Sequence, residues 1–446
     1  MTRKYQLWLV LFPFIVLVGL FVRGQLRPVT EPDSRYYVEF DWSSWTSILN
    51  STRTFGYPAF LRAAALLGAE NAAVPFLQWL AAMCAAWLVY WGLLRAGYRV
   101  TIAFWCAIVL MLNRQMIDSV HLVMADSLAT SMAIASVACF FAITAKSDNA
   151  LAWCGLAIFT FAAYQVRPAY LFLVPFWPLT VLVSDVLLVR RGSSFATLAK
   201  RATLAALLII VPFVGFCTLR WCTVGHWGLV SFGGYNVIGI AGQFLDRQLA
   251  NELPETVRPL ALRLAEEKEK LGLNTGAIDF DSMEKGYNIL VWRIAVPAAE
   301  EIYENDSVAI NRNLSQLSNA IIQRRKATFV KWLFINVKHA VSEMLQLTIR
   351  DGGTLLILLI TGLLHLHSLV FGTNRTAEVS RAAPEETIRI EAHLVFWTAL
   401  GFATAKAMLV VMVEPSVSRY MTSAIALLPV AVAAIAGQYI CRRKYS

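Results

Sequence analysis

Long apolar runs recur along the whole chain, and they decide what kind of structure it can form. Most are long enough to cross, or nearly cross, a lipid bilayer, and a weaker one lies at 100–112. In chain order the runs lie at about 5–22, 72–94, 100–112, 123–145, 150–166, 168–189, 203–222, 354–371, 392–413 and 419–440. We therefore predict an all-α polytopic membrane protein with about ten transmembrane helices.

The composition of the 446-residue chain agrees with a membrane protein. Hydrophobic residues make up 58% and charged residues 15%, whereas soluble domains carry roughly a quarter charged residues. These values exclude a disordered chain, a disulfide-stapled secreted domain and an ordinary cytosolic enzyme. The net charge of +10 does not indicate nucleic-acid binding, because Lys and Arg at the ends of membrane spans give the same surplus. The seven cysteines show no metal-ligand or CxxC spacing.

Basic residues predict the orientation of the spans. The first run follows Arg3 and Lys4 without a small-residue cleavage site after it, so we interpret it as an uncleaved anchor with a cytoplasmic amino terminus. The positive-inside rule then assigns these residues to the cytoplasm: Arg95, Arg99, Arg190, Arg191, Lys200, Arg201, Arg375, Arg381, Arg389, Arg442, Arg443 and Lys444. Ten spans, including 100–112, satisfy this pattern and leave both termini in the cytoplasm.

The apolar stretch 329–349 is not predicted to be a span. Counting it would move the basic carboxyl-terminal tail to the outside. It also carries Lys331, Lys338, His339 and Glu343 at intervals, a pattern typical of a helix that lies in the membrane interface.

Two segments are predicted on the outer, periplasmic side. One is the loop 23–71, and the other is the stretch 223–353, which we call the insert. The insert is nearly neutral, and its pattern predicts amphipathic helices. The clearest is PETVRPLALRLAEEKEKLG, which ends at Gly272. Further helices are expected at 283–303 and 308–326. The predicted organisation is a transmembrane module at 1–222 with a catalytic outside loop, the insert at 223–353, and carboxyl-terminal transmembrane helices at 354–446.

Charged residues at the outer side supply the candidate site. The first loop contains five arginines where the positive-inside rule predicts few: Arg23, Arg27, Arg35, Arg53 and Arg62. They either pair with acidic residues of the same loop or bind an anionic ligand at the outer leaflet, and we favour the ligand. A second set lies at or inside span ends: Asp118, Asp126, Arg167, Lys406 and Arg419. Lys406 is within snorkelling reach of the interface and is either functional or structurally paired, whereas His365 and His367, near an inner span end, are interpreted as structural.

Several short motifs resemble one family. The first loop reads EPDSRYYVEFDW and STRTFGYPAFLR, the turn before the fourth span reads NRQMIDSVHLVMADSLAT, and YQVRPAY and EPSVSRYM follow. This order resembles the GT-C superfamily of membrane glycosyltransferases, which includes the dolichyl-phosphate-mannose-protein mannosyltransferase and aminoarabinose transferase group. The resemblance implies catalytic carboxylates at Asp33 and Asp126, and donor-phosphate arginines at Arg53, Arg167 and Arg419. The segment 225–326 has no counterpart in it.

The resemblance implies transfer of a sugar from a polyprenyl-phosphate donor to an acceptor hydroxyl outside the membrane. Because phosphate is a good leaving group, one carboxylate suffices: Asp33 would accept the acceptor's proton while the anomeric carbon inverts. Arginines would stabilise the charge on the departing phosphate, with Tyr57, Lys406 and Tyr420 as further substrate-binding candidates. Ser34 stands where a second carboxylate is common, so we predict no cofactor, and a divalent metal stays the open alternative.

Each assignment has a structural alternative. Asp33 follows Pro32 and suits a turn or helix cap, with Asp41 and Glu39 as reserve carboxylates. Asp126 suits a cap of the fourth span or a pair with Arg114. Arg167 suits an interfacial anchor, and Tyr57 in GYP suits a turn.

Two rival functions remain at this point. A secondary transporter would use intramembrane Asp126 and Lys406, although the repeated halves typical of transporters are not visible. A lipid-linked glycan polymerase or ligase would share the arginines. The expected partners are a lipid-linked sugar donor, a glycan, lipid or protein acceptor and the bilayer, with no nucleic acid. The expected location is the bacterial inner membrane, with the endoplasmic reticulum as the alternative.

Overall fold

The chain is predominantly helical in the part that its computed structural model describes. That part is residues 3–443 apart from 69–70, 146–148, 187–193, 274–277, 305, 356, 358, 361–362 and 364–384. Within it there is no strand, and the only β-type pairing is an isolated bridge between Val29 and Leu122. Among the described residues, six helices are long and apolar enough to cross a membrane. The prediction of an all-α polytopic membrane protein is confirmed.

Nine of the ten predicted spans coincide with helices. These are α1 (Arg3–Val22), α5 (Val74–Arg95), α6 (Val100–Met111), α8 (Ala125–Ala145), α9 (Ala150–Val166), α10 (Leu173–Ser184), α11 (Phe195–Val224), α20 (Glu385–Val413), and the pair α21 (Ser418–Ala424) and α22 (Leu428–Arg443). The eighth, at 354–371, falls largely outside the described residues, as do His365, His367, Arg190, Arg191, Arg375, Arg381 and Lys444.

The tenth span differs from its prediction because it is broken. Pro429 has no backbone N–H, so it cannot donate to the preceding turn, and the helix is interrupted between α21 and α22. Asn113 donates its side-chain amide to the carbonyl of Ala426 in this interruption, over 3.1 Å. The short helix before the break, α21, carries the polar residues Ser418, Arg419 and Thr422.

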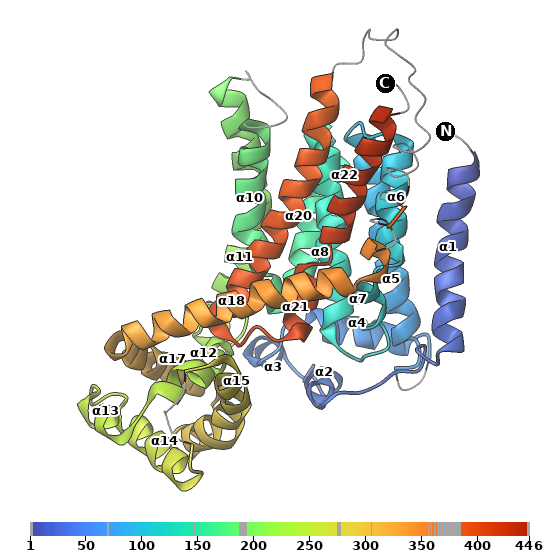
Figure 1. Cartoon of the computed structure of the whole chain (residues 1–446). Helices are drawn as coiled ribbons and strands as arrows, with labels where there is room; N and C mark the ends of the chain where they lie inside the picture. Colours follow the sequence, from blue (N-terminus) through green and yellow to red (C-terminus); the bar gives the residue numbers. More distant parts are fainter. Residues whose placement is uncertain are drawn as a thin grey trace.

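The spanning helices lie side by side, with the first loop and the insert at the same end of the bundle (Figure 1). The start of α1 and the end of α22 lie at the opposite end, as the ten-span topology requires. Close packing depends on small residues: a Cβ on Gly92 of α5 would lie 2.2 Å from the carbonyl oxygen of Ala138 on α8. Which end faces the cytoplasm stays a prediction from charge.

The insert forms a hydrophobic core of its own. Its helices before α18 are α12 (Gly233–Ala241), α13 (Arg247–Glu252), α14 (Arg258–Lys270), α15 (Phe280–Ile289), the π-helical turn η5 (Leu290–Ala295), α16 (Val296–Tyr303) and α17 (Ser307–Arg324). Gly272 has a φ of 63° directly after α14, so the predicted helix end is confirmed. The predicted helices at 283–303 and 308–326 are also present, whereas the short α12 and α13 were not predicted.

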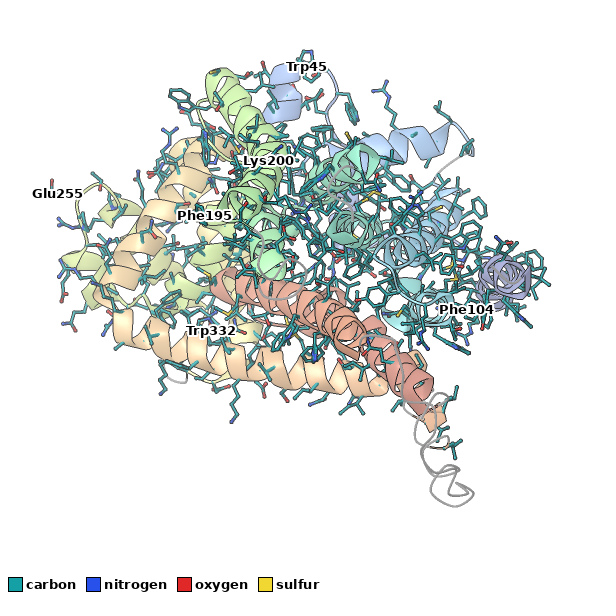
Figure 2. The ribbon with its side chains drawn as sticks, turned by 90° about the horizontal axis from the view of Figure 1, so that it is seen from above. Trp45, Phe104, Phe195, Lys200, Glu255 and Trp332 are labelled. Atoms are coloured by element: carbon teal, nitrogen blue, oxygen red, sulfur yellow. The ribbon has the colours of Figure 1, made fainter. Side chains whose placement is uncertain are left out.

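Helix α18 (Lys326–Arg350) runs across the end of the bundle rather than along it (Figure 1). It is absent from the candidate spans found among the described residues, as predicted. One face carries exposed apolar side chains: Val330, Phe334, Val341, Leu345 and Ile349. Such a stripe suits a helix at the membrane interface. Seen from above, the insert lies to one side of the bundle, and α1 lies at the other edge beside Phe104 (Figure 2).

Candidate active site

The first outside loop is a series of short helices that fix the position of Asp33. They are η1 (Pro32–Ser34), α2 (Arg35–Val38), α3 (Trp45–Asn50) and α4 (Gly56–Ala65). Ser34 is buried, accepts a hydrogen bond from the backbone N–H of Glu31 at 2.8 Å and donates to the carbonyl of Val123 at 2.9 Å. Ser34 thus ties η1 to the segment just before α8. Asp33 lies inside the short turn η1, whose N-cap position is Glu31, so it occupies a turn and not the cap position of this helix.

Asp126 lies in the first turn of α8, and the turn before it is held from two sides. Gln78 on α5 donates to the carbonyls of Val120 and Leu122 at 2.9 and 2.8 Å. The Val29 backbone bonds to the same turn from the first loop. The alternative pairing of Asp126 with Arg114 is wrong, because Arg114 pairs with Asp118 at 2.6 Å.

Prolines place the arginines at helix ends. Arg167 precedes Pro168, which disfavours helical backbone at the residue before it, and α9 ends there with Arg167 at a φ of −148°. Pro415 likewise follows the end of α20. Asn336 on α18 then holds the connection to α21: its amide donates to the carbonyls of Val411 and Glu414 at 3.1 and 2.9 Å. Arg419 is the second residue of α21.

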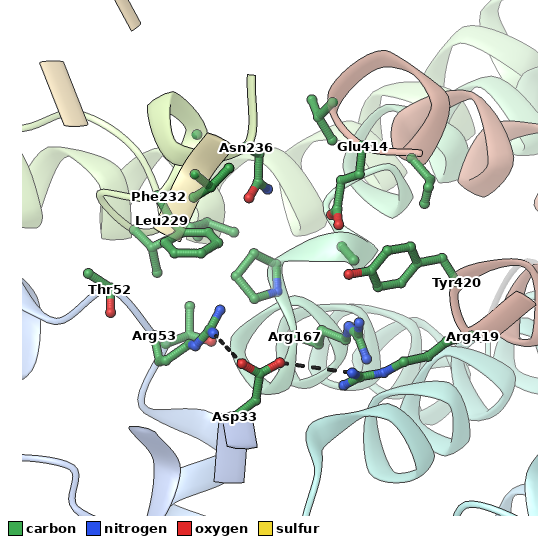
Figure 3. Close-up of a pocket in the computed structure, with 18 of the residues that line it drawn as sticks. Asp33, Thr52, Arg53, Arg167, Leu229, Phe232, Asn236, Glu414, Arg419 and Tyr420 are labelled. Carbon is green, nitrogen blue, oxygen red and sulfur yellow. Dashed lines mark ion pairs between the residues drawn. The ribbon is translucent and has the colours of Figure 1, made fainter. Parts of the chain in front are cut away.

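Five of the residues predicted from sequence come together in one ion-pair network. Arg419 lies between the two carboxylates, with Nη1 3.9 Å from Asp33 Oδ2 and Nη2 3.3 Å from Asp126 Oδ2. Arg53 Nη2 lies 3.6 Å from Asp33 Oδ1, and Arg167 pairs with Asp126. Figure 3 shows Asp33 between Arg53 and Arg419. The network joins segments that are far apart in the sequence.

This network borders a cavity of about 660 Å³. Its charged lining residues are Glu31, Asp33, Arg53, Arg167, Glu414 and Arg419. Apolar side chains from the end of α20 continue the lining at Leu409, Val410 and Val413, and α12, α15 and η5 of the insert close the other side. The cavity therefore joins a charged region to the apolar end of a membrane-spanning helix.

Arg53 is held by aromatic rings more than by carboxylates. Its guanidinium carbon lies 4.7 Å from the ring centre of Phe232, 5.3 Å from that of Tyr36 and 5.7 Å from that of Tyr37. Its Nε is buried without a hydrogen-bond partner among the described residues. Charge-assisted hydrogen bonds are typically about 2.7–2.9 Å long, so the longer contact to Asp33 leaves this guanidinium able to bind a further anion.

Two predicted binding residues lie behind the cavity lining rather than in it. Tyr57 is fully buried and packs against Tyr37 and Phe60. Lys406 is 2% exposed, and its Nζ lies 3.5 Å from the ring centre of Tyr170. Burial keeps Lys406 from snorkelling to the interface. Neither residue is among those that line the cavity, whereas Tyr420 does line it.

The reserve carboxylates lie outside this cavity. Asp41 accepts a hydrogen bond from the backbone N–H of Ser43 at 2.8 Å, and with Glu39 it lines a separate hollow of about 370 Å³. Asp33 is therefore the carboxylate of the first loop that this geometry favours.

Glu414 was not singled out from the sequence. The Tyr420 hydroxyl hydrogen-bonds its carboxyl, and burial raises the pKa of Glu414, while Tyr420 and the nearby arginines oppose that shift. An acidic residue followed by proline, directly after the last apolar residue of a predicted span, is the signal that could have identified it.

No cluster of three or more His, Cys, Asp or Glu side chains suited to a metal ion occurs among the described residues. The absence of a metal requirement stays a prediction.

No family model and no curated protein matches the chain. Among solved structures, it is similar to ArnT from Cupriavidus metallidurans bound to undecaprenyl phosphate, with 15% identity and a TM-score of 0.37. The match covers 98% of this chain and 78% of that chain.

Proposed function

We propose that this protein is an inverting glycosyltransferase that moves a sugar from a polyprenyl-phosphate donor to an acceptor hydroxyl on the outer side of the membrane. The observation that carries the proposal is the position of Asp33 between Arg53 and Arg419 at a cavity that continues onto the apolar end of α20. A phosphate with a long apolar chain matches both halves of this lining.

Arg53, Arg167 and Arg419 are the proposed phosphate ligands. Phosphate oxygens would compete with Asp33 and Asp126 for these guanidinium groups. The contacts to Asp33 are long, at 3.6 Å from Arg53 and 3.9 Å from Arg419. Donor binding would then release Asp33 to act as a base. Asp126 has the more buried carboxylate and pairs with two arginines, so its proposed role is to orient Arg167 and Arg419.

The proposed reaction needs one proton acceptor. The acceptor oxygen attacks the anomeric carbon, the bond from that carbon to the phosphate oxygen breaks, and its electron pair stays on the phosphate. The acceptor's proton passes to Asp33. The arginines stabilise the charge that grows on the phosphate oxygen. Attack opposite the leaving group inverts the anomeric centre.

The proposed location is a bacterial inner membrane with both termini in the cytoplasm. The distribution of Lys and Arg along the sequence supports this orientation. The donor would reach the cavity from the outer leaflet, and the acceptor would approach from the aqueous side.

Transfer of radiolabelled sugar from polyprenyl-phosphate donors in membranes tests the proposal. We expect transfer that requires the wild-type protein, is lost in Asp33→Asn at equal expression, and persists in EDTA. Loss of transfer in EDTA would overturn the expectation that no metal is needed. Substrate-dependent ion uptake into proteoliposomes, without transfer over a panel of donors, would instead indicate a transporter.

A further inference from the structure

The cavity has two chemically different sides. Every charged side chain among the described lining residues comes from the first loop or the membrane bundle. The insert supplies only uncharged side chains to the lining. Its polar and aromatic members are Phe232, Asn236, Tyr287, Asn288 and Trp292, which we call the insert wall.

The geometry of the insert directs this wall toward the ion-pair network. Figure 3 shows the Asn236 side chain directed into the cavity, on the side opposite Asp33. Phe232 packs on Arg53, with 4.7 Å between its ring centre and the guanidinium carbon. Tyr287 approaches Glu414 and Tyr420 closely enough to interact electrostatically with both. The wall therefore faces the position proposed for the donor phosphate.

A π-helical turn sets the position of Trp292. The turn η5 spans Leu290–Ala295 between α15 and α16, and π-turns inside helices occur frequently at functional sites. Val291 and Trp292 of this turn line the cavity, and Trp292 is 41% exposed. An exposed indole beside two amides is a surface that stacks on a sugar ring and hydrogen-bonds its hydroxyls.

We infer that the insert wall reads the sugar of the lipid-linked donor and is built for an uncharged, hydroxyl-rich sugar ring. This inference rests on the proposed function, and it adds the class of sugar and the role of the insert. A cationic or anionic ring substituent on this side would be removed from water without an opposite charge on the wall to pair with. Amides and aromatic rings instead match hydroxyls and C–H faces.

Binding measurements on the full-length protein in nanodiscs separate the sugar from the lipid phosphate. The probes are undecaprenyl phosphate, undecaprenyl-phosphate glucose and an undecaprenyl-phosphate amino sugar. In Asn236→Ala and Trp292→Ala we expect affinity for the glucose-bearing lipid to fall about 3- to 10-fold, as loss of one neutral contact predicts. Affinity for undecaprenyl phosphate should not change. Asn251→Ala, an exposed asparagine on α13 outside the cavity, is the matched control.

A charge placed on the wall tests the class of sugar. Asn236→Asp should shift the preference from the glucose-bearing lipid toward the amino-sugar lipid by about tenfold, because the new carboxylate pairs with the ammonium group. Equal losses for the sugar-free and sugar-bearing lipids in Asn236→Ala would overturn the inference, as would wild-type preference for the amino-sugar lipid. Failure of the wild type to bind undecaprenyl phosphate at all would overturn the proposed function itself.

Discussion

The bundle side and the insert side of the cavity differ in both chemistry and construction. The bundle side carries the ion pairs, on side chains held at the ends of α8, α9 and α21. The insert side carries rings and amides on helices that pack around a separate hydrophobic core. The difference indicates that reaction chemistry and sugar recognition are built on separate structural units. Changes on one side should therefore leave the function of the other side intact.

The largest effect is expected from Asp33→Asn on the bundle side. The amide cannot accept the acceptor's proton, so transfer should fall by about 10²- to 10⁴-fold, the usual contribution of a general base. Binding of undecaprenyl phosphate should persist, because the arginines remain. Asp41→Asn in the same loop is the matched control, since that carboxylate lies outside the cavity. Equal transfer rates in the two variants would exclude Asp33 as the base.

Arg419→Gln should have the next largest effect. Arg419 contacts both Asp33 and Asp126, and removing one preorganised donor to a developing charge costs about 3 kcal/mol, or roughly 10²-fold in rate. Affinity for undecaprenyl phosphate should also fall. The exposed Arg62 provides the control variant Arg62→Gln, and identical kinetics in both variants would contradict the phosphate-binding role.

Lys268→Met should destabilise the insert while leaving the bundle unchanged. Lys268 is buried, and its Nζ donates to the carbonyls of Gly242, Gln243 and Leu245 at 2.9, 3.0 and 2.6 Å. Leaving these carbonyls unpaired should cost about 2–3 kcal/mol. Hydrogen exchange should show faster opening of α12 and α14 and no change in α5 or α8. Lys270→Met removes an exposed ion pair and is the control. If Lys268→Met instead accelerated hydrogen exchange equally in the insert and in the bundle, the two would not fold as separate units.

The same lysine predicts a pH dependence confined to the insert. Burial lowers the pKa of Lys268 from 10.5 to about 8. The unfolded insert therefore keeps this proton between about pH 8 and 10.5, whereas the folded insert loses it, so the free energy of unfolding should rise with pH across this interval. Below about pH 8 both states are protonated and the contribution is constant. The measurement is the free energy of unfolding of the insert at pH 7.5 and 9.5, in the wild type and in Lys268→Met. An equal change in this free energy between the two pH values in both proteins would refute the prediction.

Gly239→Ala should give the smallest effect and should act on sugar recognition. A Cβ at Gly239 would lie 2.4 Å from Cε2 of Tyr287 and 2.8 Å from Cγ2 of Val291, so the ring and η5 must shift. Overpacking of this kind costs about 1–3 kcal/mol. We expect a several-fold higher KM for the sugar donor with little change in kcat. At Gly215 on α11 a Cβ meets nothing within 4 Å, so Gly215→Ala should retain wild-type kinetics.

Sequence reasoning was strongest for the bundle side and weakest for the insert side. Asp126 and Arg419 stand out in the sequence because charged residues at the ends of apolar runs are rare and conspicuous, whereas Asp33 lies within the first loop and was predicted from the motif EPDSRYY. Asn236 and Trp292 have no such contrast with their neighbours, since amides and aromatic residues are common in solvated helices. Lys406 was conspicuous for the same reason as Asp126, but its Nζ packs on the ring of Tyr170 and it does not line the cavity.

The amino-acid sequence by itself determined which apolar runs form helices, that α18 is not among the candidate spans, and where α9 ends. These features are local: apolar runs must satisfy their backbone groups as helices in lipid, and Pro168 disfavours helical backbone at Arg167, where α9 ends. Only the tertiary structure decided that Arg419 meets Asp126 across 293 residues, and that an uncharged wall of the insert faces them. Contacts at such separation depend on how whole helices and loops pack, and no local pattern in the chain encodes that packing.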